Sequence, residues 1–331
     1  MNQKSFILSE WYAWYITRLR VTWSYLKRLS PYYTQKKKAS SAGASFVATI
    51  FDGKIQVGGL ADRLRGILST YYICKKTGRP FKLHFVSPFN LELFLVPNQY
   101  DWRCKEHELC FDKHSTSVLP LFTTRDGLYQ SKKQEQWLYS HISRTNRQCH
   151  VYTNALFSYE YDYKQLFFEL FKPSDALQQT LDHYNGILGE SYISISCRFL
   201  DLLDDFNETQ AIHASFTDVE KKALIERVLY EIDKLHLQYP NRTILCNSDS
   251  VTFLNEAAKM DYTYVVPGEI THLEGMVKRD DYKLYEKTFV DFFLIAKASH
   301  IYLLKTGLMY DSGFPYAASK LYGKPFDKIV F

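Results

Sequence analysis

The sequence contains few of the residue patterns that mark metal-binding, redox or disulfide-stapled proteins. Its 331 residues include only six cysteines, and no two of them form a C-x-x-C pair or follow a metal-ligand spacing. Several stand in apolar stretches typical of strands or helices, so we expect reduced thiols packed in the interior. The six are Cys74, Cys104, Cys110, Cys149, Cys197 and Cys246.

Segments that would anchor or export the chain are also lacking. No stretch approaches the roughly 18 consecutive apolar residues that cross a bilayer. The first apolar stretch is short and is not followed by the small-residue cleavage site of a secretory signal. We therefore expect a cytoplasmic protein.

The common nucleotide motifs and a uniformly basic surface are missing as well. Neither G-x-G-x-x-G nor the Gly-Lys-Ser/Thr of a P-loop occurs, which leaves dehydrogenase and ATPase functions without support. The net charge of +5 is uneven: residues 1–40 carry eight Lys or Arg and one acid, or +7, so the remaining 33 basic and 35 acidic residues give −2. A nucleic-acid-binding protein carries its basic residues on the folded domain, so that class is excluded.

The basic leader is rich in aromatic residues. On a helix, residues 11–33 present a broad apolar arc that runs from Trp11 to Leu29. Trp and Tyr mixed with Lys and Arg suit the headgroup region of an anionic membrane, whereas the same arc also suits a helix packed on the body of the protein. Residues 36–43 resemble a solvated linker, so we expect a protein that starts near Ser45 to stay folded.

Strand and helix patterns alternate along the rest of the chain. Residues 100–170 follow no clear periodicity. Predicted strands cover residues 46–51, 81–86, 192–199, 243–246, 262–266 and 301–304. Predicted helices follow Gly58-Gly59 and the capping box at Thr217, and cover residues 251–260, 284–298 and 315–321. This alternation predicts an α/β protein with doubly wound parallel sheets.

Paired glycines open the first predicted helix. Gly58 and Gly59 let the backbone approach a ligand closely, and the helix start behind them offers free N–H groups to an anion. Asp62 lies in the first turn, where a carboxylate also serves as an ordinary helix cap, and Arg63 follows it. A Gly-Gly turn by itself is weak evidence for a site.

An arginine leaves the clearest strand at its carboxyl end, where parallel sheets bind ligands. The guanidinium of Arg198 is suited to grip a diphosphate through two parallel hydrogen bonds. Four acids follow it, Asp201, Asp204, Asp205 and Glu208. Most of these acids belong to a solvated loop on the simplest interpretation.

A carboxylate also occurs inside an apolar helix near the C-terminus. Asp291 is surrounded in sequence by Phe289, Val290, Phe292 and Phe293. A buried acid needs a partner, so Asp291 is either a satisfied structural acid or a ligand contact.

Taken together, four motifs resemble the fucosyltransferase superfamily. They are G-G-L-A-D-R-L-R-G at residues 58–66, R-x-x-D at 198–201, S-D-S at 248–250 and D-F-F-L-I-A-K-A-S-H-I at 291–301. The match is strongest to the rhizobial nodulation and N-glycan core fucosyltransferases, with xyloglucan and protein O-fucosyltransferases as more distant kin. It covers about residues 50–75 and 190–320.

The resemblance implies a GT-B fold, in which two Rossmann-like doubly wound domains face a cleft. It places an N-terminal extension at residues 1–42, an acceptor-side domain at 43–188 and a nucleotide-sugar-binding domain at 189–331. It implies inverting transfer of fucose from GDP-fucose to a glycan hydroxyl, without a metal or other cofactor. The implied partners are the nucleotide sugar and a glycan acceptor. Separately, the charge and the tryptophans of the leader lead us to expect an anionic membrane surface on the inner face of the membrane as a further partner, and hence a lipid-linked or membrane-proximal glycan acceptor.

The resemblance also assigns residues to the site. Arg198 matches the arginine that binds the β-phosphate. With neighbouring acids as candidate bases, the expected catalytic set is Arg198, Asp205 and Glu208. The implied donor-binding set is Gly58, Gly59, Asp62, Arg63, Ser196, Arg198, Asp201, Asp249, Asp291, Thr306 and Ser312. Asp249 falls in the guanosine-side turn, and either Thr306 or Ser312 stands for a family serine near the phosphates.

The chain departs from the family pattern in three places, one of which is Phe199-Leu200 where the family usually has Arg-Gly or Arg-Thr. Ser196 stands where the family usually has His, and Phe206 occupies the position of the catalytic Glu of core fucosyltransferases. The general base is therefore left open among Asp204, Asp205 and Glu208. Two alternatives follow, a GT-B transferase that uses another nucleotide sugar and a non-catalytic sugar-binding relative.

Overall fold

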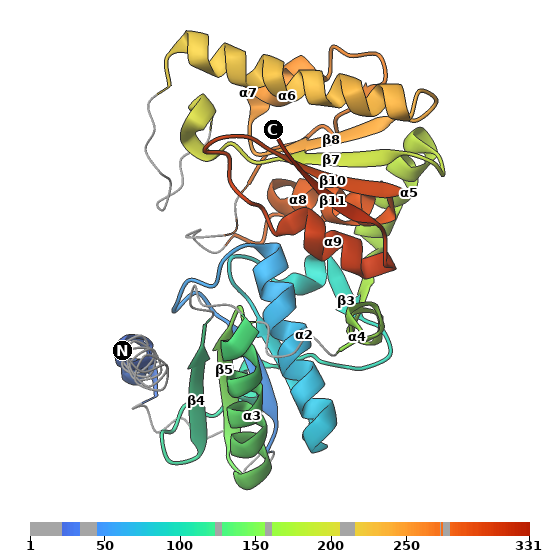
Figure 1. Ribbon diagram of the computed structural model, residues 1–331. Coiled ribbons are helices and arrows are strands. Elements are labelled where there is room, and N and C mark those ends of the chain that lie inside the picture. Colours follow the sequence, from blue (N-terminus) through green and yellow to red (C-terminus); the bar gives the residue numbers. More distant parts are fainter. Residues whose placement is uncertain are drawn as a thin grey trace, which may run out of the picture.

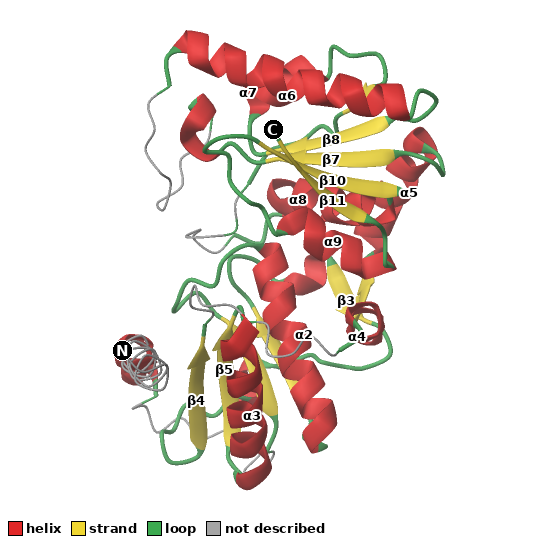
Figure 2. Ribbon diagram, viewed as in Figure 1, coloured by secondary structure: helices red, strands yellow, loops and turns green. Residues whose placement is uncertain are grey.

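The computed structural model consists of two α/β halves, one above the other in Figure 1 and Figure 2. It describes residues 22–33, 45–122, 128–155, 161–205, 216–271, 273 and 279–331. Most of the basic leader and the predicted linker lie outside these ranges.

The N-terminal half contains a four-stranded parallel sheet in the order β2-β1-β5-β4. Its strands are β1 (Val47–Phe51), β2 (Phe81–Phe85), β4 (Thr116–Leu121) and β5 (Gln148–Thr153). Its helices are α2 (Leu60–Thr77), α3 (Leu128–Arg144) and α4 (Tyr163–Leu170), with short 3-10 helices at Ser30–Tyr32, Leu91–Leu93 and Glu106–Glu108. The pair β3 (Leu95–Pro97) and β6 (Phe171–Pro173) is antiparallel.

The C-terminal half contains a five-stranded parallel sheet in the order β11-β10-β7-β8-β9. Its strands are β7 (Ile193–Cys197), β8 (Ile244–Ser248), β9 (Thr263–Tyr264), β10 (His300–Lys305) and β11 (Phe326–Val330). Its helices are α5 (Asp175–Leu188), α6 (Asp218–Gln238), α7 (Val251–Ala257), α8 (Tyr282–Lys297) and α9 (Phe314–Tyr322), with a 3-10 helix at Leu200–Leu203. Helices α6 and α7 cover one face of this sheet, and α8 and α9 lie on the other (Figure 1). The predicted α/β class with parallel sheets is confirmed.

Local sequence signals explain where several helices begin and end. Helix α2 ends at Gly78, whose φ of +68° is a left-handed conformation that glycine adopts without strain. Helix α6 begins at the predicted capping box, in which the Thr217 hydroxyl accepts from the Glu220 N–H and the Glu220 carboxylate accepts from the Thr217 N–H. A side chain at Gly66 would place a Cβ 2.4 Å from the Thr153 carbonyl oxygen, so a glycine there lets α2 pack closely against β5.

One apolar core runs through both halves. The Phe94 and Phe289 rings stack with centroids 4.2 Å apart, and the Phe89 and Tyr285 rings lie 4.5 Å apart. These pairs join loops of the N-terminal half to α8 of the C-terminal half, and all four side chains are buried. A second core fills the space between the C-terminal sheet and α6 and α7. The two halves therefore share buried surface instead of meeting through a wet interface.

The described part of the leader packs on the N-terminal sheet. Residues 22–29 are helical, and Leu29 and Tyr33 are almost fully buried. The Tyr33 hydroxyl lies 2.7 Å from His150 Nδ1 and 3.1 Å from the Tyr152 hydroxyl on β5. Of the two interpretations of the leader, packing on the body is thus correct for this part, while Trp23 remains 71% exposed.

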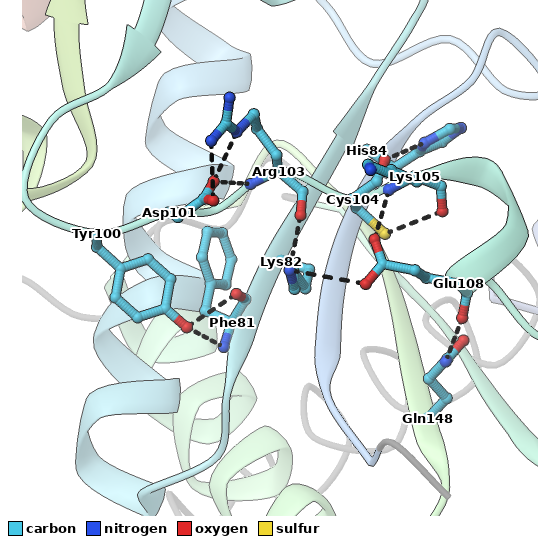
Figure 3. Close-up of polar contacts among 10 residues, drawn as sticks. All are labelled: Phe81, Lys82, His84, Tyr100, Asp101, Arg103, Cys104, Lys105, Glu108 and Gln148. Atoms are coloured by element: carbon cyan, nitrogen blue, oxygen red, sulfur yellow. Dashed lines mark hydrogen bonds and ion pairs between the residues drawn. The ribbon is translucent and has the colours of Figure 1, made fainter. Parts of the chain in front are cut away.

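The segment after β3 lies beside the edge strand β2, in the region whose periodicity was uninformative. Figure 3 shows the Tyr100 hydroxyl bonded to both the N–H and the carbonyl of Phe81, at 2.8 and 2.9 Å. Further along, the Lys82 ammonium donates to the Arg103 carbonyl at 2.8 Å, and Gln148 Nε2 donates to the Glu108 carbonyl at 2.8 Å. Side chains, more than ladder hydrogen bonds, fix this segment to the sheet.

All six cysteines are free thiols, and all are buried except Cys104, which is half-buried, as the sequence predicts. Within the described ranges, no helix is both long and apolar enough to cross a membrane. Nor do the described His, Cys, Asp and Glu residues form a group of three or more that could hold a metal ion.

Candidate functional site

The carboxyl ends of three neighbouring parallel strands bring together residues that are far apart in the sequence. Arg198 follows β7, Asp249 follows β8 and Thr306 follows β10. Strand β7 pairs with both β8 and β10, so the loops after them leave the sheet at a common edge. This is the edge at which doubly wound sheets bind ligands.

The Arg198 guanidinium is held between a carboxylate and an aromatic ring. Its Nε lies 3.7 Å from Asp249 Oδ2, and its central carbon lies 5.1 Å from the centroid of the Tyr310 ring. The Tyr310 N–H donates to the Arg198 carbonyl at 2.9 Å. Arg198 is thus fixed to the loops after both neighbouring strands.

Asp249 organises the turn that carries Arg198. Its two carboxylate oxygens accept from the N–H groups of Phe199 and Leu200, at 2.8 and 2.9 Å. Leu200 has a φ of +56°, a left-handed conformation that is costly for a residue with a side chain. Burial raises the pKa of the Asp249 carboxyl above its usual value, against the opposing effect of these hydrogen bonds and of Arg198. Asp249 therefore positions Arg198 through the backbone of the turn and through the ion pair with Nε.

Several buried polar atoms of the described residues lie without hydrogen-bond partners, and two of them lie near this edge on neighbouring strands. These two are Ser196 Oγ on β7 and Asn247 Oδ1 on β8, and the two residues are register partners in the sheet. Asn247 uses its Nδ2 on Ser194 Oγ, at 3.2 Å. Most buried polar atoms in folded proteins are paired, so such atoms at a ligand-binding edge have hydrogen-bonding capacity available for a ligand.

The loop between β10 and α9 contains both candidates for the family serine. Thr306 and Ser312 are buried. The Thr306 carbonyl accepts from the Met309 N–H at 3.1 Å, and the Ser312 hydroxyl accepts from the Phe314 N–H at 3.3 Å, at the start of α9. The structure brings both residues to the edge that holds Arg198, and the choice between them stays open.

The acids after Arg198 are engaged with neighbouring helices. Asp205 accepts from the hydroxyl of Ser250, and from the N–H and the hydroxyl of Thr252 at 2.9 and 2.7 Å, so it caps the start of α7. Asp204 forms an ion pair with Lys221 on α6. Asp201 lies in the 3-10 helix after β7. Glu208 lies outside the described residues, and its predicted role as a base stays a prediction, as does that of Asp205.

The glycine pair precedes α2 as expected. Gly58 has a φ of +58°, and a side chain there would collide with the Asp62 carboxylate, so this position requires glycine. Gly59 is the residue before the helix and provides no side-chain cap. Asp62 forms an ion pair with Arg65, and both side chains are half-buried. The first turn of α2 therefore carries its own charge pair.

Arg63 connects the two halves. Its guanidinium donates to the carbonyls of Gly58, Ser87 and Leu273, at 3.0, 2.8 and 3.3 Å. It also lies over the rings of Phe51 and Phe85. These contacts give Arg63 a structural role, and its predicted contact with the donor stays a prediction.

Asp291 forms a separate polar cluster on α8. Its carboxylate pairs with Lys287 one turn earlier, with Nζ 2.9 Å from Oδ2 and 3.1 Å from Oδ1. Lys287 Nζ also donates to the Val266 carbonyl at 2.9 Å. Burial raises the pKa of the Asp291 carboxyl, and Lys287 opposes this. Asp291 is thus paired within the protein, and its predicted contact with the donor stays a prediction.

The sequence analysis identified Arg198 and Asp249 but did not identify Tyr310 or Asn247. Tyr310 lies in the loop between β10 and α9, and Asn247 lies near the end of β8. Neither residue belongs to a periodic pattern. Tyr310 contacts Arg198, and Asn247 pairs with Ser196 on β7, only because the fold brings distant segments together. The single available signal was a large aromatic residue among the turn residues 306–313.

Comparisons with known proteins agree on the architecture. No family model and no curated protein sequence matches the chain. The solved structure of the NodZ alpha-1,6-fucosyltransferase soaked with GDP-fucose is 15% identical and superposes with a TM-score of 0.50, covering 84% of this chain and 92% of that one. A variant of Arabidopsis thaliana FUT1 in complex with GDP is 13% identical, with a TM-score of 0.54, covering 93% and 74%. The chain therefore has the same overall fold as these fucosyltransferase structures, the GT-B fold.

Proposed function

We propose that this protein is a glycosyltransferase that transfers fucose from GDP-fucose to a glycan hydroxyl with inversion. The observation that carries the proposal is Arg198, fixed at the carboxyl end of β7 by Asp249. The unpaired atoms of Ser196 and Asn247 lie on the same strand ends. Among the similar structures, the NodZ crystal was soaked with GDP-fucose and the FUT1 variant is in complex with GDP.

In the proposed reaction the acceptor oxygen attacks C1 of fucose from the face opposite the leaving group. The bond between C1 and the β-phosphate oxygen breaks, and GDP leaves with that electron pair. The Arg198 guanidinium neutralises the charge that develops on the β-phosphate, which is the role of a metal ion in other transferases. A carboxylate among Asp205, Asp204 and Glu208 takes the proton of the acceptor hydroxyl.

Binding of GDP tests the proposal directly. Loss of a charge-assisted contact to a diphosphate costs about 2–4 kcal/mol, so we expect Arg198→Ala to weaken GDP binding by roughly 30- to 1000-fold in calorimetry. Arg198→Lys should be nearly as weak, because lysine lacks the planar fork.

Arg242 provides a matched control. It precedes β8 at the opposite edge of the same sheet, with its guanidinium carbon 5.2 Å from the Tyr239 ring. Arg242→Ala should leave GDP affinity unchanged. A folded Arg198→Ala protein with wild-type GDP affinity would remove the proposed role of this residue.

Two further outcomes decide between the alternatives. A thermal-shift screen of GDP, UDP and CMP identifies the nucleotide, because a ligand that binds the folded state raises the unfolding midpoint. Stabilisation by UDP and not by GDP would indicate another nucleotide sugar, and GDP binding without transfer to any acceptor would indicate a non-catalytic relative.

Transfer should persist in excess EDTA. If activity is lost in EDTA and manganese restores it, the metal-independent mechanism is contradicted.

A further inference from the structure

Tyr310 contacts the proposed phosphate-binding arginine in two ways. Its ring centroid lies 5.1 Å from the guanidinium carbon of Arg198, and its N–H donates to the Arg198 carbonyl at 2.9 Å. The side chain and the backbone of Arg198 are therefore both fixed to the same residue of the β10–α9 loop.

The loop that carries Tyr310 is itself anchored. The neighbouring Met309 is almost fully buried in the second core, and its N–H donates to the Thr306 carbonyl at 3.1 Å. The Lys305 ammonium donates to the Met309 carbonyl, and the Ser312 N–H donates to the Tyr310 carbonyl at 3.1 Å. The position of the tyrosine ring is thus set by the body of the domain.

The contacts around Arg198 differ in kind. Asp249 supplies a negative charge near Nε, which attracts the guanidinium without fixing the tilt of its plane. An aromatic face attracts a cation through the ring quadrupole and favours stacking of a planar guanidinium. Tyr310 is also 49% exposed, so its ring lies at the surface of the edge where a ligand would enter.

We propose that Tyr310 is a positioning residue for the donor diphosphate. Its ring fixes the plane of the Arg198 guanidinium, so that the N–H fork faces the β-phosphate. This inference rests on the proposed function, because it requires that Arg198 binds a diphosphate.

A comparison of GDP with GMP tests this role, because GMP has no β-phosphate. Loss of a cation–π contact of this kind should weaken GDP binding about three- to tenfold in Tyr310→Leu, while GMP binding stays unchanged. Tyr310→Phe should retain wild-type affinity for both nucleotides, since the contact uses the ring face and not the hydroxyl.

Tyr316 is a matched control on α9. It is also 49% exposed and has the Lys320 ammonium 4.7 Å from its ring centroid. Tyr316→Leu should bind GDP and GMP as the wild-type protein does. In addition, Tyr310→Leu should add little to the loss of GDP affinity in Arg198→Ala, because it acts through that arginine.

The possible failures are distinct. If the wild-type protein binds neither nucleotide, the proposed function is overturned and this inference with it. If the wild-type protein binds GDP but Tyr310→Leu does so equally well, only the inference is overturned. Equal losses for GDP and GMP, or losses that add fully to those of Arg198→Ala, also overturn it, because Tyr310 would then act independently of the β-phosphate.

Discussion

Both halves are built on parallel sheets, but the two sheets use their polar side chains differently. In the N-terminal sheet, Asp52 follows β1 and accepts from the Lys54 ammonium and, at 3.0 Å, from the Tyr152 hydroxyl. Behind it, Tyr33 and His150 extend a hydrogen-bonded network into the interior. These groups satisfy one another within the protein.

The C-terminal sheet leaves hydrogen-bonding capacity at its carboxyl edge. Ser196 Oγ and Asn247 Oδ1 are buried and have no partners among the described residues, and Arg198 directly follows the strand that contains Ser196. Buried polar groups that pair internally contribute to a unique fold, whereas unpaired ones at a sheet edge indicate ligand binding. We therefore expect polar substitutions in the N-terminal half to change stability and those at the C-terminal edge to change binding.

The largest expected change in stability comes from substitution of Tyr33, which belongs to the internal network of the N-terminal sheet. Tyr33→Ala removes a buried ring and breaks the hydrogen bonds to His150 and Tyr152, so the free energy of unfolding should fall by about 3–5 kcal/mol. Chemical denaturation of the full chain measures it. The adjacent Tyr32 is 43% exposed, so Tyr32→Ala should change the free energy of unfolding by less than about 1 kcal/mol.

This result also decides how the leader contributes to folding. The sequence predicts that a protein starting near Ser45 stays folded, but that protein would lack both Leu29 and Tyr33, which are buried in the N-terminal core. We therefore expect such a truncation to be strongly destabilised. A truncated protein as stable as the full chain would show that the network has no energetic importance.

The second effect is the pH dependence of stability through His150. Burial lowers its pKa to about 3, while the unfolded chain titrates near 6.5. Because the unfolded state binds the proton more readily, stability falls as pH decreases below about 6.5, by about 2 kcal/mol between pH 7 and 5. His84, whose pKa is also lowered by burial, contributes with the same sign.

Denaturation at several pH values separates the contributions. His150→Gln should reduce the slope of stability between pH 7 and 5, although it also lowers stability at pH 7. His114→Gln, at an exposed position, should keep the wild-type slope. An unchanged slope in His150→Gln would show that acid sensitivity arises elsewhere.

The smallest expected effect concerns the outer surface of the same N-terminal segment. Tyr25 packs on Phe122 with ring centroids 4.4 Å apart, whereas Trp23, Lys27 and Arg28 are exposed. We propose that this exposed surface binds anionic membranes, where each basic residue contributes about 1 kcal/mol.

Sedimentation with anionic vesicles at low salt measures this binding. Trp23→Ala combined with Lys27→Gln should reduce the bound fraction severalfold, and salt should reduce it further because exposed charges are screened. The matched Trp137→Ala, which removes a 45% exposed tryptophan on α3, should have no effect. Full-length protein that ignores such vesicles would remove the membrane proposal without affecting the nucleotide site.

The sequence predicts the C-terminal half better than the N-terminal half for a physical reason. Strand β7 and helix α6 carry regular apolar patterns with a capping box, and these are local signals. Strand β5 instead places Gln148, His150 and Tyr152 in the interior. Their polarity hides the strand, because it is compensated only by partners distant in the sequence, such as Tyr33.

The candidate site shows the same division. Arg198 and Asp249 were predictable because they follow recognisable strands or motifs. The contact of Tyr310 with Arg198 was not, because it depends on how the β10–α9 loop is anchored. Asp291 pairs with Lys287, four residues earlier on the same helix. The four-residue spacing alone does not show whether such an acid pairs with its neighbour or binds a ligand.

The apolar core shared by the two halves restricts how the protein can move. A hinge motion would have to separate the stacked rings of Phe94 and Phe289 and the adjacent pair Phe89 and Tyr285. Exposing four such side chains to water costs on the order of several kcal/mol, so opened molecules would form a very small fraction of the population. The two sheets should then move as one rigid body, and any rearrangement around a bound ligand should be confined to the loops.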